Sequence, residues 1–426
     1  LAMSGALGED WAAADAALNR LITEHSESPL VLQTLLAVAQ SAEDSEHWIL
    51  AIKLYEAMIA PGKDSPYHAN GLYGLAWCRH QNGEFAKAEQ HCRDFGVEYP
   101  KHVLAPDAAF LLGESLRDAG DLEAAAAAFD ESFRKHRPAR QAFLSGVEAA
   151  RAQFKLKKSA EGDKAYAAVT AAYPDVPEHD KLFHEWAMSL YGVEQFDRSD
   201  AVFRELIATH PESNLVDNAR YSLAESELIN GNSDAAKAEF LKLVSDEKSD
   251  SLVQEESLFR LVGINIEAEE WKDAIKYSGE LTTRFPDGDY AAEAQFYQGD
   301  AHIHLKQYDQ AETVLAALTK YESDAELSQT DWFPHTWVLL AEAQLQLKEY
   351  SDVLKTVDGM EAWNPESQVL YRIHEILGRA CKNQAKFDEA REAFKRVTQS
   401  IHGRRTETAA KSQLMIAETW FLQEKY

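Results

Sequence analysis

The sequence predicts an all-α solenoid built from helical hairpins that repeat along the whole chain. Three observations lead to this prediction. In most copies an aromatic residue is followed three positions later by a small residue, and this pair recurs about every 37 residues. A second small residue lies nine positions before every pair but one, where Val262 stands, and prolines follow many of the second helical segments. A fixed period of this size is typical of repeat arrays, in which each unit buries its apolar face against its neighbours.

The recurring aromatic position marks the expected second helix of each hairpin, with a core residue four positions after the small one. Successive small positions are 37 residues apart six times, and then 38, 37, 42 and 37 apart. The copies that start at Ser159 and Phe196 match less well. The eleven copies are Trp11/Ala14/Leu18, Trp48/Ala51/Tyr55, Phe85/Ala88/Cys92, Leu122/Ala125/Phe129, Ser159/Gly162/Tyr166, Phe196/Ser199/Phe203, Ser233/Ala236/Phe240, Trp271/Ala274/Ser278, Tyr308/Ala311/Leu315, Tyr350/Val353/Val357 and Phe387/Ala390/Phe394.

The expected first helices carry the second small residue, which lets the two helices of a hairpin approach each other. Helices come within about 8–10 Å only where the side chains between them are short. These positions are Ala2, Ala39, Ala76, Gly113, Ala150, Ala187, Ala224, Val262, Gly299, Ala341 and Gly378. Prolines end the second helices because their ring nitrogen carries no N–H. They are Pro100, Pro138, Pro174, Pro211, Pro286 and Pro365. Gly83, Gly120 and Gly231 lie in the turns and suit helix C-caps.

This pattern of small, aromatic, alanine, aromatic and proline positions resembles that of tetratricopeptide-repeat (TPR) proteins over essentially all 426 residues. The resemblance implies a right-handed superhelix of about ten complete hairpins, forming one continuous array over residues 1–426. The period is longer than the family's usual value of about 34. The extra residues follow the proline, as in the segments 98–110 and 284–296.

The longer linker is similar to that of bacterial cell-envelope TPR proteins, such as the Tol-Pal accessory and outer-membrane assembly lipoprotein families. This resemblance favours the periplasm or cell envelope over the cytoplasm, although the residues themselves leave the location open. Leu1–Ala2 and Ile416–Ala417 both match the middle of a first helix. We therefore expect a segment of a longer array, with both ends inside a repeat, because arrays need polar capping units at their ends.

The composition excludes some partners. The chain has 43 Lys and Arg residues against 71 Asp and Glu residues, a formal charge of −28. Such a chain repels phosphate backbones, so nucleic acid is not an expected partner. Its apolar runs fall well short of the roughly 20 residues of a membrane helix, so no membrane insertion is expected. Cys78, Cys92 and Cys381 all fall in predicted helices and are interpreted as small core residues.

No motif for catalysis, a cofactor or a metal stands out. Phosphate loops, dinucleotide-binding glycines, nucleophile elbows and zinc motifs are absent from the sequence. On a helix, Asp300 and His304 share a face, whereas His302 falls on the buried side, so a metal site is not expected. The segment 321–337, which carries five extra residues, is either a loop packed by its own aromatics or a docking knob.

One face of each first helix is the candidate binding surface, because the resemblance places it on the concave side of the superhelix. Large apolar groups on an exposed face often mark an interaction site; the alternative is that neighbouring repeats bury them. The candidate partner-binding residues are Tyr73, Trp77, Phe110, Arg117, Arg151, Phe154, Tyr191, Tyr221, Phe259 and Phe296.

Charge along this line is expected to change sign, from basic in the middle units to acidic in the later ones. The basic residues are Arg117, Arg151 and Lys181, and the acidic ones are Glu225, Glu256, Glu293, Asp300 and Glu342. The sequence thus favours a non-catalytic scaffold that binds a protein or peptide segment in its groove, in a bacterial envelope or surface assembly. One alternative is a structural subunit that self-associates through array ends and convex faces. Another is the recognition arm of an enzyme whose catalytic domain lies outside this segment.

Overall fold

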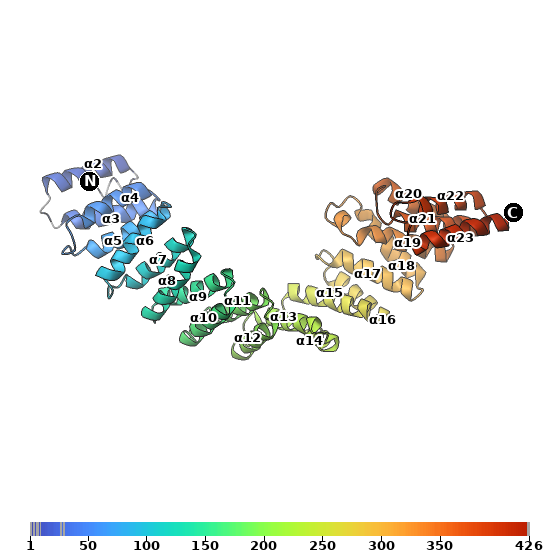
Figure 1. The fold of residues 1–426 in the computed structure, drawn as a ribbon, viewed down its shortest axis with the longest axis horizontal. Coiled ribbons are helices and arrows are strands. Elements are labelled where there is room, and N and C mark those ends of the chain that lie inside the picture. The colour runs from blue at the N-terminus through green and yellow to red at the C-terminus, as the bar shows by residue number, and fades with distance from the viewer. Residues whose placement is uncertain are drawn as a thin grey trace. The chain divides into compact units, whose positions relative to one another are not determined.

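The computed structural model describes residues 10–25, 28 and 30–423, together with Ala2, Gly5 and Gly8. This part of the chain contains 22 α-helices, two short 3₁₀ helices and no β-strand, and the fold is 77% helical. The all-α solenoid of repeats is therefore confirmed (Figure 1). None of the described helices is both long and apolar enough to cross a membrane.

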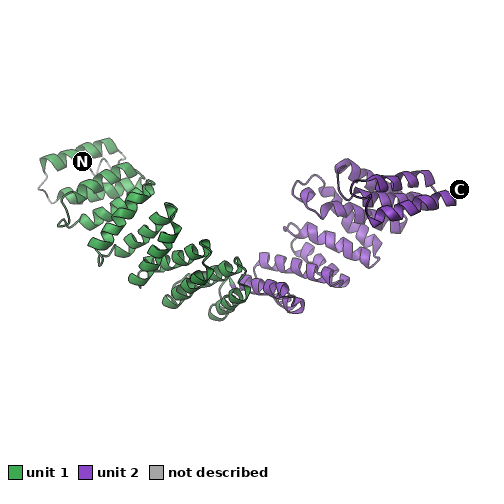
Figure 2. Cartoon of the chain, in the orientation of Figure 1, with its two compact units in different colours: residues 1–215 green, residues 216–426 purple. Residues whose placement is uncertain are grey.

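The helices divide into two compact units, residues 1–215 and 216–426, which are coloured separately in Figure 2. In unit 1, consecutive helices pack against each other as hairpins from α3 onwards. Its first helices are α3 (Leu30–Asp44), α5 (His68–Gln81), α7 (Ala105–Asp118), α9 (Arg140–Lys155) and α11 (His179–Tyr191). Its second helices are α2 (Trp11–Glu24), α4 (Trp48–Ile59), α6 (Phe85–Glu98), α8 (Leu122–Lys135), α10 (Ser159–Ala172) and α12 (Phe196–Thr209).

Unit 2 is built in the same way. Its first helices are α13 (Val216–Ile229), α15 (Ser251–Glu267), α17 (Ala291–His304), α19 (Phe333–Leu347), α21 (Leu370–Asn383) and α23 (Glu407–Leu422). Its second helices are α14 (Ser233–Ser245), α16 (Trp271–Arg284), α18 (Tyr308–Leu318), α20 (Tyr350–Trp363) and α22 (Phe387–Gln399). From α3 to α22 the described residues contain ten complete hairpins, the number expected. That the two units form one continuous array stays a prediction.

Each of the eleven second helices begins at the first residue of a predicted copy, including the weak copies at Ser159 and Phe196. The small residues of the first helices face the core residues of the second. A Cβ on Gly113 would overlap the ring of Phe129, and one on Gly378 would overlap Phe394. The repeat therefore records which side chains meet inside each hairpin.

The ten turns inside the hairpins share one geometry. In each, the residue two positions before the second helix has a positive φ, and the next N–H bonds back to a carbonyl five residues earlier. Asp121, for example, donates to Leu116 at 3.0 Å. This is the Schellman arrangement that satisfies the last carbonyls of a helix. Gly83, Gly120 and Gly231 occupy the left-handed position as predicted. The other seven residues are Glu46, Lys157, Glu194, Glu269, Lys306, Lys348 and Ala385.

The prolines end the second helices in the way the sequence predicts. Pro100, Pro174 and Pro286 each lie two residues after the last helical residue. The residue before each of these prolines has left the helical region, with φ near −130° and ψ between 48° and 63°. The proline ring disfavours a helical conformation in the residue that precedes it. The loops that follow carry the chain to the next first helix.

The extended segment 321–337 is packed by its aromatic side chains rather than projecting as a knob. Phe333 and Trp337 are buried, and both rings contact Trp363. The Trp363 indole N–H donates to the Glu322 carbonyl at 2.9 Å, which ties this loop to α20. Cys78, Cys92 and Cys381 are buried free thiols, as predicted. Burial raises the pKa of all three, so their thiolate forms are disfavoured.

Candidate functional site

The ten predicted partner-binding residues lie on α5, α7, α9 and α11 of unit 1 and on α13, α15 and α17 of unit 2, and in each unit we call the side that carries them the first-helix face. None of its eight aromatic residues is fully exposed or fully buried. Five contact an aromatic residue of the second helix in their own hairpin. These ring pairs are Tyr73–Phe95 (6.4 Å), Phe110–Phe129 (5.6 Å), Phe154–Tyr166 (6.0 Å), Tyr191–Phe196 (5.0 Å) and Tyr221–Phe240 (5.5 Å). Each of these five rings therefore packs between the two helices of its hairpin, and only part of its surface is exposed.

The remaining three aromatics pack against residues of first helices and loops. Trp77 stacks on His80 with ring centroids 6.4 Å apart. Phe259 stacks on Tyr290 at 4.5 Å, and Phe296 lies 5.3 Å from Trp332. Each of these rings is thus partly buried by intramolecular contacts and partly exposed, and its role in binding a partner stays a prediction.

In unit 1 the two arginines of the first-helix face are held in ion pairs between successive first helices. Arg151 binds both carboxylate oxygens of Glu185, at 2.5 and 2.6 Å, and reaches Glu148 at 2.6 Å. Arg117 contacts Glu148 at 3.3 Å. The Tyr166 hydroxyl adds a hydrogen bond to Glu185 at 2.6 Å. These glutamates, which the sequence analysis did not single out, pair with Arg117 and Arg151 but not with Lys181, and the change of charge along this line stays a prediction.

In unit 2 the first-helix face is rich in aromatic rings and carboxylates. Phe259 contacts Tyr290 and Tyr297, and Tyr297 contacts Phe296, so the rings form one cluster across α15 and α17. Arg260 donates to the Tyr221 hydroxyl at 3.2 Å and pairs with Glu225 at 2.9 Å. We call the surface that these residues form with nearby carboxylates the acidic aromatic patch. It consists of Tyr221, Glu256, Phe259, Tyr290, Glu293, Phe296, Tyr297 and Asp300.

The carboxylates of this patch are held in an unusual setting. Among the described residues, no basic side chain lies within ion-pair distance of Glu256 or Glu293, and Asp300 has only His304, at 3.8 Å. The Tyr297 hydroxyl donates to Glu293 at 3.1 Å. Burial raises the pKa of Glu256, Glu293 and Asp300 above their ordinary values. A half-buried carboxylate without a cation is poorly solvated, which favours its protonated form. The patch therefore has both charge and aromatic surface to offer a cation.

The residues considered for a metal are engaged elsewhere. The His304 ring stacks on Trp271 with centroids 4.0 Å apart, and His302 Nδ1 lies 2.7 Å from the side-chain oxygen of Gln307. His302 is buried, as the helix spacing predicts. Over the described part of the chain, no group of three or more His, Cys, Asp and Glu side chains is arranged to hold a metal ion.

Known protein families match the chain in both units. The family model described as a tetratricopeptide repeat-like domain matches residues 265–415, and the model described as a tetratricopeptide repeat matches residues 98–139 and 184–251. No curated protein matches the chain.

Among solved structures, the C-terminal part of a TPR repeat-containing protein from Cytophaga hutchinsonii is 13% identical, with a TM-score of 0.45. The similarity covers 61% of this chain and 98% of that one. A tetratricopeptide repeat protein from Parabacteroides merdae is 12% identical, with a TM-score of 0.35, over 63% and 98% of the two chains. YrrB, described as a TPR protein with an unusual peptide-binding site, is 15% identical, with a TM-score of 0.35, over 48% and 97%.

Proposed function

The chain belongs to the tetratricopeptide-repeat family, and from this premise we propose that it is a non-catalytic scaffold that binds an extended protein segment on its first-helix face. The segment is basic and apolar where it meets the acidic aromatic patch of unit 2. An envelope or surface assembly is the setting favoured by the long linkers, and the location remains a proposal.

One observation carries the proposal: among the described residues Glu293 lies half-buried beside aromatic rings with no basic partner, and Glu256 has only the nearby charge of Arg260, which pairs with Glu225. Elsewhere on the first-helix face the chain supplies cations to its own carboxylates, as Arg151 does for Glu185. An arginine or lysine from a partner would complete the same contact in the patch. It would also lie over the faces of Tyr290 and Phe259, where cations are attracted to the ring.

Apolar side chains of the partner would supply most of the affinity, because binding energy concentrates in a few aromatic anchors. Exposed ion pairs contribute only about 0–1 kcal/mol each, so the carboxylates mainly select the sign of the partner's charge and its rate of binding. The proposal therefore predicts a moderate salt dependence superimposed on affinity that salt does not remove.

The test uses the full chain and two labelled peptides of equal length, one alternating arginine and leucine and the other alternating glutamate and leucine. Fluorescence anisotropy should show preferential binding of the basic peptide. The double variant Glu256→Gln/Glu293→Gln should weaken that binding several-fold at low salt. Its matched control is Glu247→Gln/Glu326→Gln, which removes the same charge from exposed loop positions of unit 2.

Equal effects of the two double variants would show that net charge alone attracts the basic peptide, and the patch would lose its role. Tyr221→Ala/Phe259→Ala should weaken binding at every salt concentration. If that variant binds normally while sedimentation shows the chain to be a stable oligomer, the self-associating structural subunit becomes the better hypothesis.

A further inference from the structure

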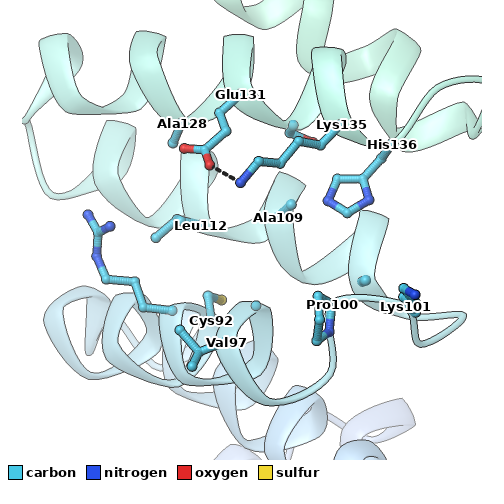
Figure 3. A pocket seen from close by; sticks show the side chains of 14 residues that line it. Cys92, Val97, Pro100, Lys101, Ala109, Leu112, Ala128, Glu131, Lys135 and His136 are labelled. Atoms are coloured by element: carbon cyan, nitrogen blue, oxygen red, sulfur yellow. Dashed lines mark hydrogen bonds and ion pairs between the residues drawn. The ribbon is translucent and has the colours of Figure 1, made fainter.

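A second surface in unit 1 is a hollow between α6 and α8 with α7 as its floor (Figure 3). Its volume is about 620 Å³, within the range of ligand pockets. The floor is formed by Ala105, Ala109 and Leu112. Around the axis of α7 these residues are displaced from Phe110 and Arg117 by roughly a third of a turn on average. The hollow is thus separate from the first-helix face.

The hollow exists because the side chains that fill this space in the neighbouring hairpins are replaced by smaller ones here. Gly96 is 37 residues before Phe133, which occupies the same position in the next second helix. Phe133 is buried and lies against Gly146, where an added Cβ would contact its ring. A Cβ on Gly96 would meet nothing within 4 Å.

Other hairpins support the same comparison. In the preceding hairpin Ile59 occupies the position equivalent to Gly96, and it packs closely on Gly71. Cys92, which also lines the hollow, replaces the aromatic residue that stands at its position in five other copies, four in unit 1 and the first one in unit 2. Those equivalents are Tyr55, Phe129, Tyr166, Phe203 and Phe240. The hollow therefore distinguishes this hairpin from the hairpins on either side of it.

The rim of the hollow is basic, in contrast to the chain as a whole, whose formal charge is −28. Arg93, Lys101 and Lys135 line it, and Glu131 is the one carboxylate among its lining residues. Glu131 pairs with Lys135, as Figure 3 shows, and Arg93 pairs with Glu89 at 2.9 Å. Within the described chain, Lys101 has no acidic partner at ion-pair distance. Lys101 would therefore attract a carboxylate of a partner directly, whereas Arg93 and Lys135 already pair with carboxylates of the chain itself.

The apolar surface continues outside the hollow. Val97 is 80% exposed at its edge, next to Pro100. A polypeptide with one apolar side chain in the hollow and another on Val97 would cover both parts, whereas an enclosed small molecule would leave Val97 in water. Exposed apolar surface beside a recess is the usual sign of a partner site.

We propose that this hollow binds an acidic protein segment, which inserts an apolar side chain onto the α7 floor between α6 and α8. Carboxylates on either side of that side chain meet Arg93, Lys101 and Lys135. The occupant is opposite in charge to the segment proposed for the acidic aromatic patch. The scaffold would thus have a second binding surface with its own specificity.

The glutamate–leucine peptide described above is the probe, with the full chain as its receptor. Gly96→Ile introduces the residue that Ile59 provides one unit earlier and fills the hollow without a steric conflict at Cβ. It should weaken binding by at least about tenfold, the usual effect of losing an apolar contact in a pocket. Thr398→Ile, at the same helical position of α22, is the matched control and should leave binding unchanged.

Two further arms test the charge and the apolar anchor. Lys101→Glu/Lys135→Glu should weaken binding of the acidic peptide most at low salt. An acidic peptide with serine in place of leucine should bind the unsubstituted chain with much lower affinity. Equal binding by the Gly96→Ile and Thr398→Ile chains would overturn the proposal, as would the absence of any binding by the acidic peptide. The arginine–leucine peptide is measured in parallel. Its binding should be unaffected by Gly96→Ile, so failure of either proposed site can be told apart from failure of the other.

Discussion

Glycines inside the helices of this chain occupy two different environments. At Gly113, Gly299 and Gly378 an added Cβ would overlap the facing core residue of the second helix. At Gly96 and Gly263 it would meet nothing within 4 Å. The first group lets two backbones approach each other. The second group weakens its helix, because glycine loses more conformational freedom on folding than other residues, and at Gly96 it also leaves the hollow open.

Substitution to leucine should separate these two environments. Gly113→Leu should lower stability by about 1–3 kcal/mol, because the Phe129 ring already fills the space beside it. Gly263→Leu should cause no such loss and gain up to about 1 kcal/mol of helix propensity. Amide exchange in α7–α8 and α15–α16 measures each local effect. An unchanged opening free energy in the Gly113→Leu hairpin would contradict the contact assigned to this glycine.

The buried carboxylates of unit 2 have a predictable effect on stability as pH changes. Burial raises the pKa of Glu293 in the folded chain, so its ionised form is disfavoured by folding. Its contribution to stability is therefore fully present below the unfolded-state pKa of about 4.3 and is lost as pH rises through the folded-state value. At pH 7 the wild-type chain carries this destabilisation.

Glu293→Gln should consequently raise the melting temperature of unit 2 at neutral pH and have a much smaller effect at a pH below the unfolded-state value. Differential scanning calorimetry at the two pH values measures the difference. The same substitution should weaken binding of the basic peptide. Functional sites commonly show this trade of stability against binding. A glutamine variant that is less stable at pH 7 would mean that the Tyr297 hydrogen bond outweighs the burial of the charge.

At the scale of helices and turns, the repeat predicted the structure closely. Side-chain size at two positions was enough to define the start of every second helix, because the same packing contact recurs in each hairpin. The left-handed residue of the turn was predicted only where it is glycine. Sequence gives no signal for it at Glu269 or Lys157, where the Schellman hydrogen bonds impose the conformation on an ordinary residue.

The seven turns in which a non-glycine residue has a positive φ offer sites for stabilisation. A non-glycine residue in the left-handed region costs roughly 1–2 kcal/mol relative to the right-handed one, and glycine avoids this cost. Glu269→Gly should therefore stabilise the α15–α16 hairpin by up to about 1 kcal/mol after the greater flexibility of the unfolded glycine is counted. Gly120→Ala should destabilise α7–α8 by a similar amount.

Hairpin opening free energies from amide exchange measure both changes in the turns. Lys272→Gly, three residues further along inside α16, provides the control, because there glycine should destabilise the helix. A loss of stability in the Glu269→Gly chain would show that this glutamate makes compensating contacts in the folded state.

At the scale of the whole molecule, the sequence predicts which helices carry the candidate aromatic residues, but not the ion pairs that hold the candidate arginines. Helical spacing within one helix identifies the exposed side of Tyr221 or Phe259. The partners of Arg117 and Arg151 lie on the next first helix, 31 and 34 residues away. Only the packing of one hairpin against the next brings each arginine and its glutamate together. Arg151→Glu, which would otherwise be a simple change of surface charge, should therefore also destabilise the contact between α9 and α11.

The final prediction concerns how the chain unfolds. Helices in contact are neighbours or next neighbours along the chain, so each hairpin is stabilised mainly by those beside it. Nearest-neighbour coupling of this kind allows terminal units to open before central ones. Amide exchange should show the least protection in α2 and α23 and more protection toward the middle of each unit, with no single opening free energy.

The Gly113→Leu chain makes this prediction sharper. Protection should fall in α7 and α8, and to a smaller extent in α6 and α9, while α21 and α22 keep the values of the unsubstituted chain. Such a local response is expected only if the loss is transmitted through adjacent contacts and fades with distance along the solenoid. Uniform protection from Trp11 to Trp420, or an equal loss in all hairpins, would instead indicate all-or-none unfolding and long-range coupling, which the helix contacts do not supply.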